Sequence, residues 1–378
     1  MTETAEFESW PFFNAPQREF LQSLRAWCAT QPPLDPSDER VAARRCVDAL
    51  AKGGWLRSCV PPLDVRTVCL ARETLAYCDP LFDFAFAMQA LGAGPISLFG
   101  TQEQKDRYLP AVAAGKTIMA FAISERDAGS DVAAMRTTAR REGDSYFLDG
   151  DKMWISNAGI ASLYVIFART GDPGSKGISA FIVRAASAGL KATDPITTIY
   201  PHPLGHLRLR NCRVPAENRL GAEGDGFRIA MTNLDMFRPA VGAAALGFAR
   251  RAFDETLRHV RTRELFGAPL ASQQLTQARL AAMATGIDAS ALLIYRAAYA
   301  ADTSGGRITR ESAMAKWFAT ERASEIIDSA VQLFGGRGVT KGEIVEGLYR
   351  AVRALRIYEG SSEIQQIVIA RSLLEDRR

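Results

Sequence analysis

The chain has 378 residues, which is long enough for two or three domains packed into one unit. It is 47% hydrophobic and 23% charged, and its 46 basic and 42 acidic side chains give a net charge of +4 without the block of like charge that marks a nucleic-acid-binding arm. No apolar run approaches the roughly 18 residues of a membrane span, and the acidic start is unlike a secretory signal or a transit peptide, so we expect a soluble, cytoplasmic protein with no membrane span.

The first third of the chain, residues 1–120, carries a helical pattern. Apolar side chains recur every three or four residues in Phe20–Trp27 and in Arg40–Leu50. The stretch Leu81–Leu91 is apolar almost all round, which is typical of a helix buried on every side, as the wall of a pocket or as plain core. The following Gly92-Ala93-Gly94-Pro95 predicts that this helix ends or bends.

The middle third, residues 121–222, changes to the period of two that is typical of β-strands. Turn signals at Glu142-Gly143-Asp144 and at Asp149-Gly150-Asp151 separate short β-rich runs. A further strand is expected at Tyr164–Ala168, and Pro215 is expected to close the last one. We therefore predict a β domain in this region.

Long helices return in the last region, residues 223–378. One of them should contribute the seam of a helical bundle, because its apolar residues repeat at the three-four spacing. These residues are Leu280, Met283, Ile287, Ala291, Ile294 and Ala298. The order along the chain is therefore helices, sheet, helices.

Cysteine and histidine give no sign of disulfides or of a metal. The six cysteines form no CxxC pair, and we expect free core thiols at Cys28, Cys46, Cys59, Cys69, Cys78 and Cys212. The three histidines, His202, His206 and His259, do not pair at a metal-ligand spacing. Metal catalysis is therefore not expected.

Three motifs carry the chemistry, and three more follow the same order along nearly the whole chain. The first three are Phe121-Ala-Ile-Ser-Glu-Arg-Asp-Ala-Gly-Ser-Asp131, Lys152-Met-Trp-Ile-Ser-Asn157 and Arg356-Ile-Tyr-Glu-Gly-Ser-Ser-Glu-Ile-Gln365. The others are Phe99–Pro110, Arg263–Gly267 and Gln332–Gly336. Together they resemble the signatures of the acyl-CoA dehydrogenase family.

This resemblance implies a fold, a reaction and partners. The fold would be an N-terminal α-helical domain, a middle β-barrel-like domain and a C-terminal four-helix bundle, assembled as a homotetramer. The reaction would be the FAD-dependent α,β-dehydrogenation of an acyl-CoA thioester to a trans-2-enoyl-CoA, with electrons passed to an electron-transferring flavoprotein. An acyl-CoA oxidase and a desaturase of carrier-protein-bound acyl groups would use the same base and flavin, so both stay open. A DNA-associated flavoprotein of this fold is a remote alternative, because it would need a concentrated basic surface.

Glu359 matches the position of the family's catalytic base, which takes the α-proton. It precedes Ser362 and Gln365, which predict a capping box at the start of the last helix, so we expect the carboxylate on a loop. Gly360 allows a close backbone approach, and a neighbouring N–H is expected to donate to the thioester oxygen as negative charge develops. The alternative is an exposed glutamate favoured by a helix dipole.

Some relatives hold the base on a helix, just before an arginine that corresponds to Arg238. Here that position is Phe237, which cannot accept a proton, so Glu359 is the carboxylate that remains. The resemblance also implies contacts to the substrate, and ordinary helix charges are the alternative for the first two of them. These contacts are Asp235, Arg238, Tyr358, Gly360 and Ser130.

For the flavin ring, the resemblance implies contacts from Ser124, Trp154 and Ser156. Trp154 alone would more often belong to a core. Ser156 follows two residues later, however, so one face of a strand could hold an aromatic plane and a donor. Ser130 lies in a loop that resembles the family's pyrophosphate and CoA contact, although Arg126 stands where a proline is usual.

A second set of residues matches family positions that reach the FAD of a neighbouring subunit, which would make the active unit at least a dimer. Bundle packing is the alternative for the second and third members. The set is Arg263, Phe266, Gln274, Gln332 and Gly336. Ser361 and Glu363 are expected as further FAD contacts. No GxGxxG follows a strand, so a Rossmann site is not expected.

Three departures from the family bear on the substrate, and the first two would reshape either an entrance or a subunit contact. The segment Trp55–Leu70 is short and lacks the usual glycine-rich loop, and Tyr200–Gly205 replaces a glycine- and serine-rich turn. Phe82 stands where glutaryl-CoA-type relatives hold an arginine, which disfavours a dicarboxylate substrate. Acyl chain length and shape are left open.

Overall fold

The computed structural model describes residues 5–34 and 37–375. By its internal contacts the chain divides into two compact units. The first, called the helical unit below, comprises Met1–Gln31, Asp64–Asp83 and Asp235–Arg378. The second, called the sheet unit, comprises Pro32–Leu63 and Phe84–Leu234. The sheet unit therefore takes in helices that precede the sheet as well as the strands.

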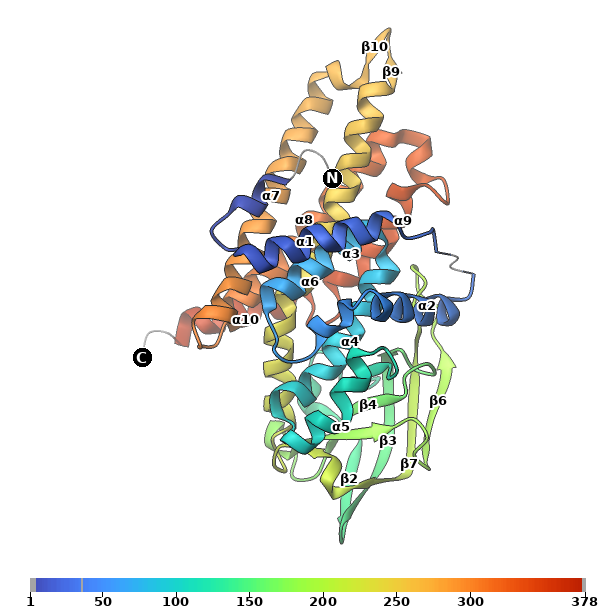
Figure 1. Ribbon diagram of the computed structural model, residues 1–378, viewed down its shortest axis with the longest axis vertical. Coiled ribbons are helices and arrows are strands. Elements are labelled where there is room, and N and C mark those ends of the chain that lie inside the picture. Colours follow the sequence, from blue (N-terminus) through green and yellow to red (C-terminus); the bar gives the residue numbers. More distant parts are fainter. Residues whose placement is uncertain (1–4, 35–36, 376–378) are drawn as a thin grey trace. The chain divides into compact units, whose positions relative to one another are not determined.

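One sheet forms the centre of the sheet unit, and the predicted middle β domain is confirmed (Figure 1). Its strands are β1 (Met119–Ala122), β2 (Thr138–Glu142), β3 (Ser145–Ser156), β4 (Leu163–Arg169), β5 (Ile178–Arg184), β6 (Leu190–Pro195), β7 (Leu204–Pro215) and β8 (Arg219–Leu220). They follow the order β6-β7-β3-β2-β4-β5-β8, and β1 pairs with β4. Neighbours in this order are antiparallel except β2 and β4, which are parallel, as are β1 and β4.

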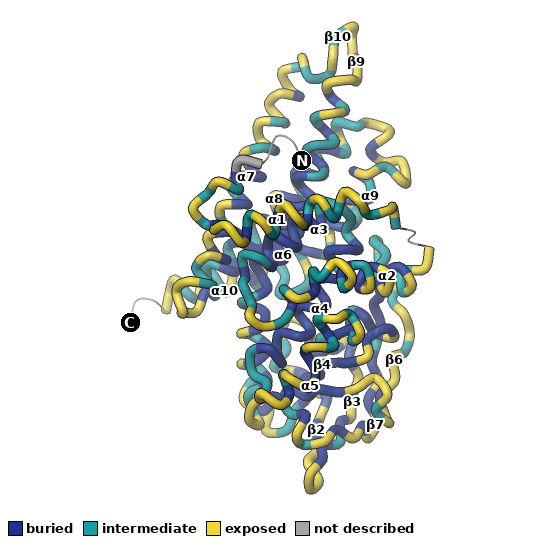
Figure 2. Tube along the Cα trace, viewed as in Figure 1, coloured by how far each residue is buried: buried dark blue, intermediate teal, exposed yellow. Residues whose placement is uncertain are grey.

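Helices α2 (Glu39–Lys52) and α5 (Gln102–Ala113), with most of α4 (Pro80–Phe99), complete the sheet unit. Side chains at every second position of β4, such as Val165 and Phe167, share one apolar cluster with Ala93 and Ile96 of α4 and Val112 of α5. Figure 2 shows β4 and most of α4 in dark blue. Strand β4 is buried along almost its whole length, as a central strand covered by helices should be.

Helix α4 does not end at Gly92–Pro95, so of the two predicted alternatives, an end or a bend, the end is wrong. The helix continues to Phe99 because both breakers are accommodated. Pro95 has no N–H for the carbonyl of Leu91, and the Asn233 side chain donates to that carbonyl instead, at 3.1 Å. A Cβ atom at Gly92 would lie 2.6 Å from the Met119 Cβ, so the glycine permits close packing of α4 against β1.

The two predicted turns of the middle domain differ in outcome. Gly143 has a φ of 58° and lies in the turn between β2 and β3, as expected. Gly150 lies inside β3, where a bulge between Leu148 and Gly150 interrupts the pairing with β7. A Cβ atom at Gly150 would meet Thr137 at 2.5 Å, so here the glycine marks a close approach of two backbones rather than a chain reversal.

The helical unit is built mainly from helices. They are α1 (Ala15–Ala29), α3 (Val65–Cys78), α6 (Gly226–Thr262, from Asp235 onward), α7 (Gln274–Thr303), α8 (Thr309–Phe334), α9 (Ile344–Val352) and α10 (Ser362–Glu375). A capping box between Asn14 and Gln17 begins α1. The predicted seam lies on α7, and all of its members are buried except Leu280, which is half-buried.

Among the residues that the structure describes, two helices are long and apolar enough to cross a membrane by length and composition, contrary to the expectation that no segment would approach this limit. In α4, 89% of the apolar window is buried inside the protein, as in the core helix of a soluble protein. In α7 the share is 33%, and side chains such as Leu275 and Leu292 are exposed. Such an exposed apolar face is typical of a surface that meets another protein.

The cysteines are all free, as expected, but Cys28 and Cys78 are half-buried rather than core thiols. Cys28 lies near the end of α1 and Cys78 at the end of α3. Over the ranges that the structure describes, no three His, Cys, Asp or Glu side chains are grouped so that they could hold a metal ion.

Candidate active site

Glu359 lies on a loop between the 3-10 helix η8 (Arg353–Arg356) and α10. Its backbone is left-handed, with a φ of 55°, and Gly360 follows with a φ of 90°. For a non-glycine residue this conformation costs about 1 kcal/mol. The side chain is half-buried, and its Oε2 atom is shielded from solvent without a hydrogen-bond partner in the described chain. The alternative of an exposed glutamate at a helix end does not fit this arrangement.

The proton affinity of Glu359 is set by burial and by three nearby cations. Burial raises the pKa of Glu359 above its ordinary value, while Arg72, Lys316 and Arg238 pull it back. The net shift is upward. A carboxylate with a raised pKa is a stronger base than a solvated one, so this environment suits proton abstraction.

The carbonyl groups on either side of Glu359 are held by one buried lysine. Lys316 of α8 donates from Nζ to the carbonyl oxygen of Tyr358 at 2.8 Å and to that of Gly360. Gln365 donates from Nε2 to the Gly360 carbonyl at 2.9 Å and to the Glu359 carbonyl at 3.3 Å. The loop that carries Glu359 is therefore fixed through its backbone.

The capping box predicted for the last helix is wrong. Gln365 does not turn back to the amide of Ser362, because its side chain is used on the carbonyls of the Glu359 loop. The Ser362 hydroxyl donates to Glu321 on α8 instead. The residues that suggested a helix cap thus serve to hold the loop in front of the helix.

A buried ion pair contacts Tyr358. The guanidinium of Arg72 on α3 binds Asp83 through two hydrogen bonds of 2.8 Å each. It also donates to the Tyr358 hydroxyl, and burial raises the pKa of this tyrosine. Sequence analysis missed Arg72 and Asp83, because they lie in stretches that show only a helical pattern.

Asp235 and Arg238 pair with each other on α6, with Arg238 Nη1 at 2.5 Å from Asp235 Oδ1. Both are buried. Thr309 donates from its hydroxyl to Asp235 Oδ2 at 2.6 Å, and Arg238 donates from Nε to the carbonyl of Glu359 at 3.4 Å. The two predicted substrate residues therefore contact the loop and α8 within the helical unit.

The backbone around Asp235 is adapted to a proline. Pro239 cannot donate to the carbonyl of Asp235 one turn earlier, and the Ser312 hydroxyl of α8 donates to this carbonyl instead, at 2.7 Å. Phe237, at the other family position for a base, is buried and has no ionisable group.

The predicted flavin-ring residues lie in the sheet unit. A bulge interrupts β3 between Lys152 and Ile155, and Trp154 within it has a φ of 61°. The Trp154 side chain is 51% exposed, Ile155 is buried and Ser156 is half-buried. The amide of Met153 donates to the carbonyl of Ser124 at 2.9 Å, which joins the loop of Ser124 to this strand.

A buried ion pair beneath these residues was missed by sequence analysis. Lys152 donates from Nζ to Glu125 Oε1 at 2.8 Å and to the carbonyl of Ile123 at 3.1 Å. Glu125 also accepts from the backbone amides of Arg136 and Thr137, at 2.7 and 2.9 Å. Lysine and glutamate at these two places give no signal in the sequence, because both types are common on surfaces.

Ser130 is exposed, as is Gly129 before it, and no atom lies within 4 Å of where a Cβ on Gly129 would be. Arg126 in the same loop is also exposed. The loop therefore presents open surface around the predicted phosphate contact.

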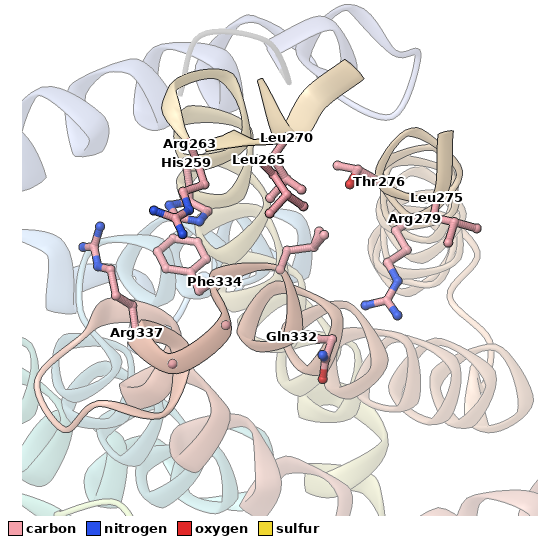
Figure 3. A pocket seen from close by; sticks show the side chains of 13 residues that line it. His259, Arg263, Leu265, Leu270, Leu275, Thr276, Arg279, Gln332, Phe334 and Arg337 are labelled. Carbon is pink, nitrogen blue, oxygen red and sulfur yellow. The ribbon is translucent and has the colours of Figure 1, made fainter. Parts of the chain in front are cut away.

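A pocket of about 550 Å³ lies in the helical unit between the end of α6, the start of α7 and the end of α8 (Figure 3). It brings together three of the residues predicted to reach a neighbouring subunit's FAD: Arg263, Gln332 and Gly336. It also contains ionisable side chains that sequence analysis did not single out: His259, Arg279 and Arg337.

The pocket is basic. Arg337 pairs with Glu343 at 3.0 Å, whereas Arg263 and Arg279 have no acidic partner among the residues described. Burial, together with the charges of Arg337 and Arg263, lowers the pKa of His259, so its ring is neutral at neutral pH. Two unpaired guanidinium groups suit an anionic ligand with phosphate-like oxygens.

The remaining predicted cofactor residues lie outside this pocket's lining. Phe266, at the tip between β9 (Glu264–Leu265) and β10 (Ala268–Pro269), is 92% exposed and has a φ of 54°. Gln274 is exposed at the start of α7. Glu363 is exposed on α10, where its side chain is hydrogen-bonded to that of Ser361.

The sequence matches three domain families that cover most of the chain. These are the acyl-CoA dehydrogenase N-terminal domain over residues 14–116, the middle domain over 120–212 and the C-terminal domain over 224–374.

Similar proteins of known name include two bacterial enzymes and a mitochondrial one. Cyclohexane-1-carbonyl-CoA dehydrogenase of Geobacter metallireducens is 39% identical over 82% of this chain and 82% of its own. The 3-(aryl)acrylate reductase of Clostridium sporogenes is 42% identical over 74% and 75%. The mitochondrial short-chain specific acyl-CoA dehydrogenase of Rattus norvegicus is 43% identical over 76% and 71%.

Solved structures agree over nearly the full length. A structure from work on the electron transferring flavoprotein of Acidaminococcus fermentans has a TM-score of 0.90 at 35% identity, and covers 96% of this chain and 99% of its own. Butyryl-CoA dehydrogenase from Megasphaera elsdenii has a TM-score of 0.88 at 31% identity, with the same coverage. A glutaryl-CoA dehydrogenase from Mycobacterium smegmatis in complex with FADH2 has a TM-score of 0.88 at 27% identity, and covers 98% and 97%.

Proposed function

Because the chain belongs to the acyl-CoA dehydrogenase family, an FAD-dependent family of oxidoreductases that act on CH–CH groups, we propose that it oxidises an acyl-CoA thioester to the trans-2-enoyl-CoA with Glu359 as the base. The observation that carries this proposal is the Oε2 atom of Glu359, which is shielded from water and has no hydrogen-bond partner in residues 5–34 and 37–375. A carboxylate oxygen in this state is available to accept a proton.

The environment of Glu359 supports the direction of proton transfer. The α-proton of a thioester is far less acidic than a solvated carboxylic acid, so the base must be strengthened. Burial raises the pKa of Glu359, while Arg72, Lys316 and Arg238 lower it by stabilising the anion. The net upward shift makes the poorly solvated carboxylate a stronger base.

The loop also supplies a donor for the thioester oxygen. In a trans peptide the carbonyl of Tyr358 and the amide N–H of Glu359 point in opposite directions. Lys316 holds the carbonyl, and the N–H has no acceptor within the described chain. We assign this N–H to the thioester oxygen, where it would stabilise the charge that develops as the α-proton leaves.

The residues present fit FAD. Trp154 offers an exposed aromatic face next to Ser156, on a strand joined to the loop of Ser124. The chemistry that bound FAD supplies is acceptance of the hydride from Cβ. Arg263 and Arg279 offer unpaired cations to a diphosphate. We therefore expect the purified protein to be yellow and to hold FAD non-covalently.

On the substrate side, we propose a monocarboxylic acyl group. Phe82 is buried against Trp27, with ring centroids 5.4 Å apart, and offers no cation to a distal carboxylate. Arg72 is already bound by Asp83 through both carboxylate oxygens. Ser130, Asp235, Arg238, Tyr358 and Gly360 stay our proposed contacts for the thioester and CoA.

The proposed partners are an electron-transferring flavoprotein and further copies of this chain. The basic pocket of Arg263 and Arg279 would bind the FAD diphosphate of a second subunit, so the active unit would be at least a dimer and, by family, a homotetramer. The exposed apolar side chains of α7, such as Leu275 and Leu292, support contact with another copy.

The test is an anaerobic assay with a panel of acyl-CoAs that differ in length, branching and aromatic content. The proposal expects at least one to bleach the flavin, and expects its enoyl-CoA product by mass. A dye acceptor then measures turnover, and oxygen consumption in its absence separates an oxidase from a dehydrogenase. Parallel thioesters of a phosphopantetheinylated carrier protein separate a CoA substrate from a carrier-bound one. Flavin that no thioester reduces would overturn the proposal.

The reverse reaction is a second candidate, favoured by the similarity to the 3-(aryl)acrylate reductase. The same carboxylate would then return a proton to Cα. Incubating dithionite-reduced protein with an enoyl-CoA, including an aryl-substituted one, tests this direction. Reoxidation of the flavin with loss of the double bond would support it.

A further inference from the structure

Lys316 is a buried cation to which sequence analysis assigned no role. It lies on α8 and is 0% exposed. Burying an ammonium group costs free energy unless hydrogen bonds replace those it made with water. Its Nζ atom donates to two main-chain oxygens, those of Tyr358 and Gly360. The hydrogen bonds that offset the cost of burying this ammonium group are therefore made to one short stretch of backbone.

These two oxygens lie on either side of Glu359. The loop needs external support, because Glu359 is held in the left-handed region with a φ of 55°. Gln365 supports the Glu359 and Gly360 carbonyls. For the Tyr358 carbonyl, Lys316 is the donor that the described chain provides. Removing Lys316 therefore releases the peptide unit that joins Tyr358 to Glu359.

That peptide unit has two ends, and Lys316 acts on both. The hydrogen bond from the Lys316 ammonium to the carbonyl oxygen of Tyr358 fixes the plane of the peptide. The N–H of Glu359 must therefore point the other way. The same charge polarises the peptide and makes its N–H a stronger donor. The ammonium thus orients and strengthens a donor from the far side of the peptide.

We propose that Lys316 is a positioning residue for proton abstraction: by holding the carbonyls of Tyr358 and Gly360, it sets the Glu359 carboxylate and the Glu359 N–H together in their working geometry. This inference rests on the proposed function. Lys316 touches no reacting atom and acts through the backbone of the base.

The charges around this lysine give the proposal a signature in the pH profile. Burial lowers the pKa of Lys316 to about 8, while Glu359, Glu321 and Glu363 raise it and Arg238 lowers it. Glu359 in turn is influenced by Arg72 and Asp83 as well as by Lys316 and Arg238. Without the ammonium, Glu359 loses one of the cations that stabilise its anion. Its pKa should then rise further.

The test compares Lys316→Met, which removes the charge and the donors, with Lys316→Gln, which keeps two N–H donors without charge. Lys341→Met, at an exposed lysine of the same unit, is the control. Each FAD-loaded protein is mixed anaerobically with an acyl-CoA that the wild type oxidises, and flavin reduction is followed from pH 5 to 9. A second ligand carries sulfur in place of Cβ, so that it can lose its α-proton but cannot give up hydride.

Lys316→Met should reduce its flavin about 10²-fold more slowly, the cost typical of a misplaced reacting group. The pH at which its rate of flavin reduction is half-maximal should rise. The pH midpoint for ionisation of the sulfur analogue should rise by a similar amount. FAD content should stay near the wild-type level, because the proposed flavin-ring residues lie in the sheet unit and Lys316 does not line the basic pocket proposed for the FAD diphosphate. Lys316→Gln should recover part of the rate but keep the shifted pH profile, and Lys341→Met should match the wild type.

Two results would overturn the inference. One is a Lys316→Met protein with the wild-type rate and pH midpoint. The other is a loss of activity in both Lys316 variants that follows only their loss of FAD or of folded protein, with the remaining fraction showing an unshifted pH midpoint. Failure of the proposed function is distinguishable from both, because it appears in the wild-type arm as an FAD-loaded protein that no acyl-CoA reduces.

Discussion

The side-chain amide of Asn233 donates to the carbonyl oxygen of Leu91, at 3.1 Å, in place of the helical N–H that Pro95 lacks. Asn233 is 0% exposed, so this bond is made away from water. It allows α4 to run unbroken through a sequence that looks like a helix end. A residue far away in the chain thus decides whether a proline breaks a helix.

We expect Asn233→Ala to lower the free energy of unfolding by about 1–3 kcal/mol, because a buried carbonyl loses its partner. Pro95→Ala returns an N–H to the helix, so the same Asn233→Ala change should cost less in that background. Urea unfolding of the two single variants and the double variant measures the difference. Simple additivity of the two changes would contradict this account of Pro95.

The buried pair of Lys152 and Glu125 should be needed for FAD retention. The pair joins the loop of Ser124 to the strand that carries Trp154. Lys152→Met leaves the buried Glu125 carboxylate without its cation. Such a change typically lowers the free energy of unfolding by about 3–5 kcal/mol. We expect it to purify with little FAD, whereas Lys191→Met, at an exposed position of the same sheet, should keep it. Flavin absorbance relative to protein decides this.

The pair of Lys152 and Glu125 also predicts that FAD is released at acid pH. Burial alone would raise the pKa of Glu125, but Lys152 and the Arg136 amide lower it below its ordinary value of 4.5. A carboxylate with a lowered pKa stabilises the fold above that ordinary value and loses this contribution as the pH falls through the lowered one. FAD release should therefore begin below about pH 4.5. In Glu125→Gln this transition should be missing, and unchanged acid release would argue against the pair as its source.

The basic pocket should link FAD binding to assembly. Arg263→Ala and Arg279→Ala each remove an unpaired cation, and loss of one charged hydrogen bond should weaken FAD binding about 10–100-fold. Arg337→Ala should do less, because Arg337 already pairs with Glu343. Sedimentation and FAD content measured on the same samples test this, and cofactor loss should accompany dissociation. A fully active, FAD-loaded monomer would contradict a shared site.

Features that depend on residues close together in the sequence could be predicted, whereas contacts between residues far apart in the chain could not. Glu359 and its loop follow from a local motif, and the helices and strands follow from periodicity, as the seam on α7 illustrates. Lys316 donates to a carbonyl 42 residues later in the chain, and nothing near it in the sequence marks that contact. A buried lysine and a surface lysine look the same in a helical pattern.

Local motifs also misled where a distant partner intervened. Gln365 and Ser362 have the spacing of a capping box, yet both side chains bind elsewhere, on the base loop and on Glu321. Gly150 looks like a turn residue, yet it lies in a strand because Thr137 packs against its backbone. In each case a tertiary contact outweighs a local preference worth about 1 kcal/mol.

The last prediction concerns Glu359 itself. Glu359→Gln keeps the size of the side chain and most of its packing but cannot accept the α-proton. Loss of a general base typically costs about 10²–10⁴-fold, and Phe237 at the other family position offers no substitute. The variant should keep its FAD and its fold, and an acyl-CoA should still perturb its flavin spectrum, but anaerobic addition of substrate should bleach the flavin at least about 10²-fold more slowly.

The rate of flavin reduction in Glu359→Asp should fall between those of the wild type and Glu359→Gln, because the variant keeps a carboxylate but moves it by one methylene. The wild-type rate should rise with pH through the raised pKa of Glu359, since only the anion accepts a proton, and Glu359→Gln should lose this dependence. Glu325→Gln, at an exposed glutamate of α8, serves as the control and should behave as the wild type. If Glu359→Gln reduced its flavin at close to the wild-type rate, another group would be the base, and the assignment of this loop as the catalytic centre would be wrong.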